Sequence, residues 1–186
     1  MYVTGANLLA NPDFSANAAS FCSQTFCILS DASAIAPWTF TNGPAFELDS
    51  PAVWAPYSGG WSMDLCANVA YTIQQQVTLD VGKPYELDVE ISENPCGPST
   101  KTGFISATGS APQSFTHDSS DPTWKRITYH FVATAAQTTI SIGGTNTGSC
   151  GPVVGYAKLV GGKAPSSASP LVSSISLIVL ALGLLF

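Results

Sequence analysis

The segment 53–61 carries three aromatic side chains, Trp54, Tyr57 and Trp61, among prolines and glycines. Rings in such a loop are difficult to bury completely, and an amphipathic ring at a protein surface is often a ligand contact. Because aromatic rings stack on the apolar C–H faces of sugars, the segment predicts a carbohydrate-binding loop. The alternative is that Trp54 or Trp61 covers one end of the core.

Sugar hydroxyls also need carboxylate or amide partners, and neighbouring segments supply them. Apolar and polar residues alternate along 71–79 and again along 85–91, which is typical of half-buried strands. If the outer face of this strand pair is concave, the polar ligands are Glu47, Asp64, Gln74, Gln76, Glu86 and Asp88. Gln75 lies among the apolar residues and is expected to be a hydrogen-bonded core amide.

Two groups of residues could support catalysis. Glu86, Asp88 and Glu90 line one face of a strand, and glycosidases use paired carboxylates, but such a stripe is also typical of a solvated strand face. The run 117–119 places His, Asp and Ser side by side, yet the members of a catalytic triad meet through the fold, so this run predicts a turn. We therefore expect no catalytic residue.

Five cysteines are present, at positions 22, 27, 66, 96 and 150, with two histidines. No C-x-x-C pair occurs, so a zinc site is not expected. Disulfides formed in an oxidising compartment are the better interpretation. Because five is an odd number, one thiol is free, pairs between chains or pairs with a residue absent from this sequence.

Composition and charge exclude several classes of protein. The chain of 186 residues is 45% hydrophobic and 10% charged, with 16 glycines and 13 prolines. It is too apolar for a disordered chain and too rich in turn-forming residues for a helical bundle. The net charge is −6 and the basic residues are scattered, so nucleic acid is not an expected partner.

The pattern of short segments predicts the fold. No segment between 1 and 160 has sustained helical periodicity, and a turn at 80–84 joins the two alternating segments into an expected antiparallel hairpin. Further strands are expected at 6–9, 37–41, 45–48, 60–65, 102–107, 113–117, 123–133, 137–142 and 153–160. This succession predicts an all-β antiparallel β-sandwich or jelly roll.

The two ends of the chain differ from its middle. The mostly apolar segment 171–186 would span about 24 Å as a helix, short of the roughly 30 Å membrane core. It follows a small, polar linker at 161–170, and together they form a signal for a GPI lipid anchor, with Ser166 as the expected attachment site. The alternative is a tail-anchor helix. Residues 1–14 lack a signal peptide, so a trimmed or misassigned start is expected.

Several motifs, taken in order, resemble galactose-binding-like domains. They are the opening 7–14, the segments 35–38, 60–65 and 72–77, the pair 123–124 with 131–133, and the cysteine loops 94–96 and 149–152. Together, residues 5–160 resemble the plant cell-wall proteins with domain of unknown function 642 and related bacterial choice-of-anchor surface domains. The resemblance implies a jelly roll over 1–160, an extracellular wall location, polysaccharide association and no known catalysis.

The resemblance also bears on disulfides. The family brings the two Gly-Pro cysteine loops together, which implies a Cys96–Cys150 bond. Cys22 and Cys27 are expected to form a local disulfide bond, which leaves Cys66 without a disulfide partner in this sequence.

A structural calcium occurs in related carbohydrate modules, held by an acidic residue after the first strand and another in the last strand. Here Ser15 and Gly155-Tyr156 occupy those places. A hard cation needs charged oxygen ligands, so no calcium, other metal or cofactor is expected.

We therefore expect a non-catalytic, GPI-anchored cell-surface module that associates with cell-wall polysaccharide. A structural or adhesive protein that binds another protein, and a weak polysaccharide hydrolase, are the alternatives. An exposed aromatic platform beside a groove favours the first function, a flat apolar patch the second, and two facing carboxylates in a cleft the third.

The anchor signal makes a testable prediction. When the full-length gene is expressed in a eukaryotic cell, phosphatidylinositol-specific phospholipase C should release the protein from the membrane, and mass spectrometry should find it ending near Ser166. Intact protein that still ends at Phe186 would contradict the prediction.

Overall fold

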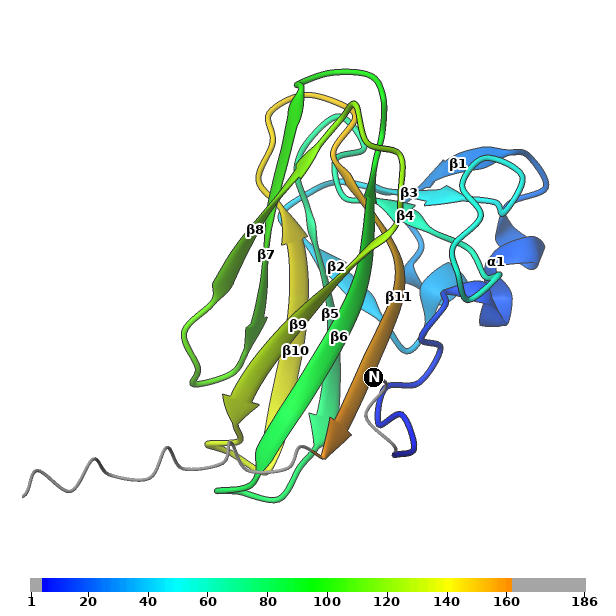
Figure 1. Cartoon of the computed structure of the whole chain (residues 1–186). Coiled ribbons are helices and arrows are strands. Elements are labelled where there is room, and N and C mark those ends of the chain that lie inside the picture. Colours follow the sequence, from blue (N-terminus) through cyan, green and yellow to red (C-terminus); the bar gives the residue numbers. More distant parts are fainter. Residues whose placement is uncertain (1–4, 162–186) are drawn as a thin grey trace, which may run out of the picture.

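Two antiparallel sheets make up most of the computed structural model, which describes residues 5–161 (Figure 1). In spatial order, the five-stranded sheet consists of β2 (Thr39–Thr41), β5 (Thr72–Thr78), β10 (Gln137–Gly144), β7 (Thr100–Ala107) and β8 (Gln113–Asp118). The four-stranded sheet consists of β4 (Met63–Asp64), β11 (Pro152–Gly161), β6 (Pro84–Glu93) and β9 (Lys125–Val132). The predicted antiparallel sandwich is confirmed.

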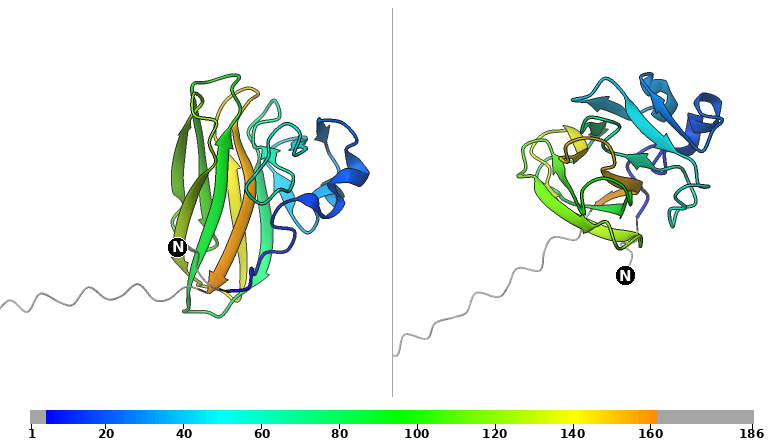
Figure 2. Two further views of the ribbon diagram at one scale, coloured as in Figure 1. Left: turned by 45° about the vertical axis from the view of Figure 1, so that its right-hand side comes forward. Right: turned by 90° about the horizontal axis from the view of Figure 1, so that it is seen from above.

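A smaller group of elements lies to one side of the sandwich (Figure 2). It contains a two-stranded ribbon and two short helices: β1 (Phe26–Leu29), β3 (Phe46–Asp49), α1 (Ser15–Phe21) and η1 (Ala32–Ile35). The sequence predicted neither helix nor β1. The seven residues of α1 bury only Ala18, so this helix has no apolar stripe that periodicity could detect.

Alternation along the strands explains how the two sheets pack. In β5, Ile73 and Val77 face the core, and in β9 Tyr129 and Phe131 do so, as expected. Burying each such side chain stabilises the fold by about 1.5–3 kcal/mol. The bulkiest fully buried apolar side chains are Trp38, Tyr71, Phe14, Phe46, Ile35, Leu48, Met63, Leu65, Ile73, Leu87 and Ile91.

The hairpin predicted for 71–91 is wrong, because β5 and β6 belong to different sheets. β5 pairs with β2 and β10, whereas β6 pairs with β9 and β11. Two strands with one apolar face each can pair side by side or face each other across a core, and alternation fits both arrangements. The connecting turn bonds to the segment 133–136: the Leu79 amide donates to Ala136 O and the Gly82 amide to Ala133 O.

The opening segment forms no strand at 6–9, but it is tied to both sheets. The amides of Leu8 and Ala157 donate to the carbonyls of Leu159 and Pro12, so the segment follows the free edge of β11. On β5, the buried Gln75 accepts from the Ala10 amide at 2.8 Å and donates to the Ala10 carbonyl at 2.9 Å. The expected core amide is confirmed.

Both expected disulfides are present, Cys96–Cys150 and Cys22–Cys27, and Cys66 is a buried free thiol. Cys96 follows β6 and Cys150 precedes β11, so this bond joins two loops at one end of the sandwich. Lys101, fully buried, donates from Nζ to the carbonyls of both cysteines. The buried Lys101 ammonium group thus stabilises the same pair of loops that the disulfide joins.

The two disulfides should differ in their contribution to stability. They enclose loops with sequence separations of 54 and 5 residues. From chain entropy, the Cys96→Ser/Cys150→Ser variant should lose about 4 kcal/mol of unfolding free energy and the Cys22→Ser/Cys27→Ser variant about 2 kcal/mol. Urea unfolding followed by fluorescence measures both losses. An equal or larger loss from the shorter loop would contradict this account.

Candidate functional site

The residues proposed from the sequence as ligands fall into separate parts of the structure. Gln74 and Gln76 lie on the outer face of the five-stranded sheet, and Glu86 and Asp88 lie on the outer face of the four-stranded sheet, because β5 and β6 are in different layers. They cannot form one surface. Glu47 and Asp64 lie on β3 and β4, and the aromatic loop connects these two strands.

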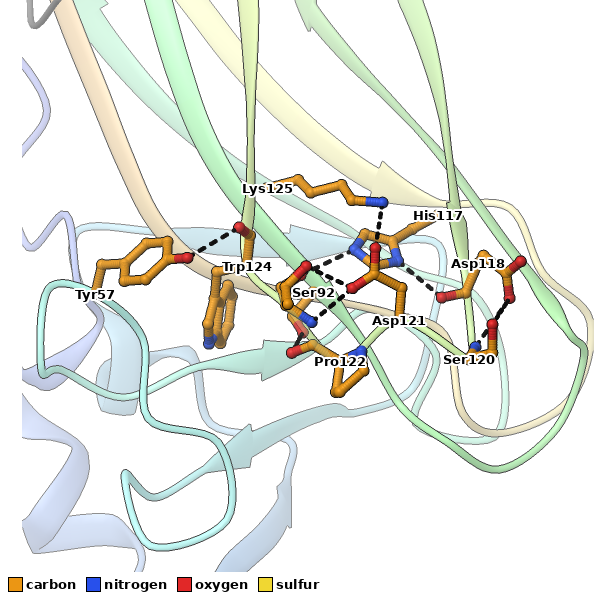
Figure 3. Close-up of polar contacts among 10 residues, drawn as sticks. Tyr57, Ser92, His117, Asp118, Ser120, Asp121, Pro122, Trp124 and Lys125 are labelled. Atoms are coloured by element: carbon orange, nitrogen blue, oxygen red, sulfur yellow. Dashed lines mark hydrogen bonds and ion pairs between the residues drawn. The ribbon is translucent and has the colours of Figure 1, made fainter.

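Within the aromatic loop, the three rings differ in exposure. Tyr57 is 70% exposed, whereas Trp54 and Trp61 are half-buried and Trp61 packs against the core. The Tyr57 hydroxyl donates to the carbonyl of Trp124 at 3.3 Å, which fixes the loop against the segment just before β9 (Figure 3). Of the three rings, Tyr57 is therefore the one with a free face for a ligand.

Glu86 and Asp88 make cross-strand contacts with β9. The Thr128 hydroxyl donates to Asp88 at 2.6 Å, and His130 Nδ1 lies 3.6 Å from a Glu86 carboxylate oxygen. Arg126 Nε lies 3.8 Å from the second Asp88 oxygen. These carboxylates thus have partners within the sheet.

Strands β3 and β4, which belong to different sheets, carry a group of mostly buried acidic side chains, Glu47, Asp49 and Asp64. Asp64 accepts from the amides of Cys66 and Gly151, both at 2.8 Å, and from the Asn94 side chain at 2.9 Å. Asp49 is fully buried and neither of its carboxyl oxygens has a hydrogen-bond partner among the described residues. Asp64 is therefore a structural residue, and the group does not form a surface for a ligand.

Burial dominates the titration of these acids. It raises the pKa of Glu47 to about 7, with a smaller contribution from Asp64, and the pKa of Asp49 to about 8, with smaller contributions from Glu47 and Asp64. Burial also raises the pKa of Asp64, although its three donors oppose the shift. Asp49 is consequently protonated at neutral pH, which lowers the cost of burying it.

The outer face of the five-stranded sheet is hollowed into a groove of about 700 Å³, called here the Phe104 groove. Its lining is Gln74, Phe104, Ser106, Ala107, Thr108, Ser110, Pro112, Ser114, Thr139, Ser141 and Thr145. An aromatic ring lies among hydroxyl groups and one side-chain amide, and no charged side chain lines it. Of the predicted ligands, Gln74 is in this groove; its Nε2 donates to the Ser141 hydroxyl at 3.2 Å.

The position of Phe104 depends on a glycine. Phe104 pairs across the ladder with Gly143 of β10, and a Cβ at Gly143 would lie 2.5 Å from the Phe104 ring. Only glycine lets the ring lie against the neighbouring strand in this way. Phe104 was not among the predicted site residues, although the alternation Thr102, Phe104, Ser106 in β7 was a signal that its ring faces outward.

The residues 117–119 lie at the end of β8 and in the turn that follows it, as expected from the sequence. His117 is buried at the end of β8, and its two ring nitrogens lie 3.0 and 3.1 Å from the carbonyls of Asp118 and Thr123 (Figure 3). Asp118 accepts from the amide and hydroxyl of Ser120. These contacts stabilise the β8–β9 connection. Among residues 5–161, no three Cys, His, Asp or Glu side chains are arranged to hold a metal.

The family model described as "Protein of unknown function (DUF642)" matches residues 7–159. A structure of TmCBM61 in complex with beta-1,4-galactotriose is similar, with a TM-score of 0.59 at 14% identity, over 85% of this chain and 100% of that chain. A family 35 carbohydrate binding module from Clostridium thermocellum is similar, with a TM-score of 0.50 at 17% identity, over 75% and 100%. None of the curated protein sequences matches this chain.

The buried acids predict how stability depends on pH. Because the folded state keeps protons on Asp49 that the unfolded chain releases above a pKa of 3.8, unfolding free energy should fall as pH rises from about 4 to about 8. Each such group contributes a slope of up to about 1.4 kcal/mol per pH unit. The Asp49→Asn variant should have a shallower slope and should be more stable than the parent at pH 8. Urea unfolding at a series of pH values measures this; an unchanged slope would contradict it.

Proposed function

The chain belongs to the DUF642 family, and from this premise we propose that it is a non-catalytic module that binds polysaccharide through the Phe104 groove. The observation that carries the proposal is the lining of the groove. A ring provides a stacking surface for the C–H face of a sugar, and hydroxyl and amide groups can donate to and accept from its hydroxyls.

The position of the groove supports an extended ligand. It crosses β5, β10, β7 and β8, which lie side by side in the five-stranded sheet, and it is of a size that small-ligand sites commonly have, about 300–1,000 Å³. The hydroxyls of Ser106, Ser114 and Ser141 come from three of these strands. Because paired strands are rigid, the groups should need little reordering when a sugar chain binds.

The chemistry of the groove favours binding without hydrolysis. Most glycosidases need two carboxyl groups on either side of the scissile bond. The lining of the Phe104 groove contains no Asp or Glu. The two similar structures described above are carbohydrate-binding modules, and one of them contains a galactotriose. The galactotriose in that structure suggests neutral oligosaccharides as the first probes for this chain.

We also propose that the module acts at the cell surface or in the cell wall, attached to the plasma membrane through a GPI lipid at Ser166. Two disulfides support an oxidising, extracellular compartment. The linker at 161–170, beyond Gly161, and the tail at 171–186 lie outside the described residues. Between residues 5 and 161, no helix has the length and apolar character needed to cross a membrane.

A second candidate function is adhesion to another protein. Phe26 and Ile28 share one face of β1, and each is 48% exposed. Exposed apolar side chains that lie together are typical of protein contacts. The Phe26→Ser/Ile28→Ser variant therefore separates the two functions, because it removes this apolar face and leaves the Phe104 groove intact.

The proposal predicts the effect of removing the ring. Removing an aromatic contact at a binding site commonly costs about 1–3 kcal/mol, so Phe104→Ala should weaken retention on wall polysaccharide at least about fivefold. The Phe26→Ser/Ile28→Ser variant is the control and should be retained like the parent. Affinity electrophoresis in gels that contain the polysaccharide measures both. If only the Phe26→Ser/Ile28→Ser variant loses retention, the polysaccharide binds at β1 and not in the Phe104 groove. If the parent is not retained at all, adhesion to another protein through β1 replaces polysaccharide binding.

A further inference from the structure

A second pocket, of about 450 Å³, lies on the outer face of the other, four-stranded sheet. Its lining is Pro12, Asp13, Tyr57, Ser58, Glu90 and Tyr156. Glu90 of β6 and Tyr156 of β11 are directly opposite each other in the ladder. The opening segment and the aromatic loop contribute the remaining residues. We call it the Glu90 pocket.

Backbone contacts fix the residues around this pocket. The Ala157 amide donates to Pro12 O at 3.0 Å, and the Trp61 amide donates to Asp13 O at 2.9 Å. On the side of the aromatic loop, the Ser58 hydroxyl donates to Gly155 O at 3.4 Å and the Tyr57 hydroxyl to Trp124 O (Figure 3). The pocket is therefore formed before any ligand enters it.

The burial and the missing hydrogen-bond partner of the Glu90 side chain indicate that this pocket binds a ligand. It is 6% exposed, and its Oε2 is buried without a hydrogen-bond partner among the described residues. A buried carboxyl oxygen without a donor is unfavourable, and a ligand that donates a hydrogen bond would remove this cost. Burial raises the pKa of Glu90, and the Arg126 guanidinium opposes that shift.

We propose that the Glu90 pocket binds one uncharged sugar residue, as a second site on the face opposite the Phe104 groove; this rests on the proposed polysaccharide binding. The exposed Tyr57 offers a ring face to the sugar, and the carboxylates of Asp13 and Glu90 accept from its hydroxyls. Two carboxylates in one pocket disfavour an anionic sugar, so uronic acids are rejected.

Two sites on opposite faces change what the module does with its ligand. One groove and one pocket on different sheets cannot contact the same short segment of sugar chain. They can hold two chains, or two distant parts of one chain, and the second contact then forms at a high effective concentration. The module would link polysaccharide chains.

The test is a titration of the ¹⁵N-labelled full-length protein with neutral trisaccharides of galactose, glucose and xylose, and with trigalacturonic acid. We expect two groups of amide shifts, one around Phe104 and one around Tyr156, that saturate independently. Tyr57→Ala and Glu90→Gln should weaken only the second group, at least tenfold. Glu86→Gln is the matched control, because it makes the same charge change on β6 outside the pocket. Trigalacturonic acid should not shift the amides around Tyr156.

Each other outcome has a defined meaning. If the neutral sugars shift only the Phe104 group, the second site is wrong and the proposed function stands. If Glu86→Gln weakens the Tyr156 group as much as Glu90→Gln, the pocket does not bind through Glu90 and the inference fails. If no sugar shifts any amide, polysaccharide binding itself is wrong. Release of new reducing ends would overturn the assignment of the pocket as a binding site only.

Discussion

Between Leu79 and Pro84 the chain passes from one sheet to the other, and this crossing decides which side chains can share a surface. Strands β5 and β6 are neighbours in the sequence, but their apolar faces meet across the core. Their polar faces therefore point in opposite directions. The module consequently has two separate outer faces, and polar side chains of β5 and β6 cannot contact the same small ligand.

Buried polar groups show where this fold departs from a simple apolar core. Gln75 and Lys101 occupy inward positions and donate to backbone carbonyls. Gln75 thereby holds the opening segment against β5, and Lys101 holds the two loops that the Cys96–Cys150 disulfide joins. Asp49 and Glu90 have oxygens without partners, but they differ in position. Asp49 is fully buried at the end of β3 and is neutralised by a proton, whereas Glu90 lines a pocket where a ligand can supply the donor. A buried carboxyl oxygen without a partner is thus part of the packed interior at Asp49 and part of the proposed ligand site at Glu90.

Alternation in the sequence was sufficient for most strands and for the all-β class, and it placed Gln75 in the core correctly, but β1 was missed and the strand expected at 6–9 does not form. It could not decide the partner of a strand, because pairing is set by contacts distant in sequence, and so it predicted a hairpin where the chain crosses between sheets. It also could not find Phe104 as a site residue: a lone outward ring is informative only once Gly143 is known to lie beside it. The acidic ligands Glu47 and Asp64 were chosen by residue type, which does not reveal burial.

The two outer faces offer different chemistry for the same class of ligand. The Phe104 groove has no charged side chain, so its selectivity must come from ring stacking and from the arrangement of hydroxyl and amide groups. The Glu90 pocket has two carboxylates, which bind hydroxyls strongly and repel anions. In a mixed polysaccharide, the groove would tolerate occasional acidic residues and the pocket would not. Because the two sheets carry different side chains on their outer faces, one small sandwich can combine two kinds of proposed contact. The Phe104 groove would accept varied residues along a polysaccharide chain, and the Glu90 pocket would select an uncharged sugar.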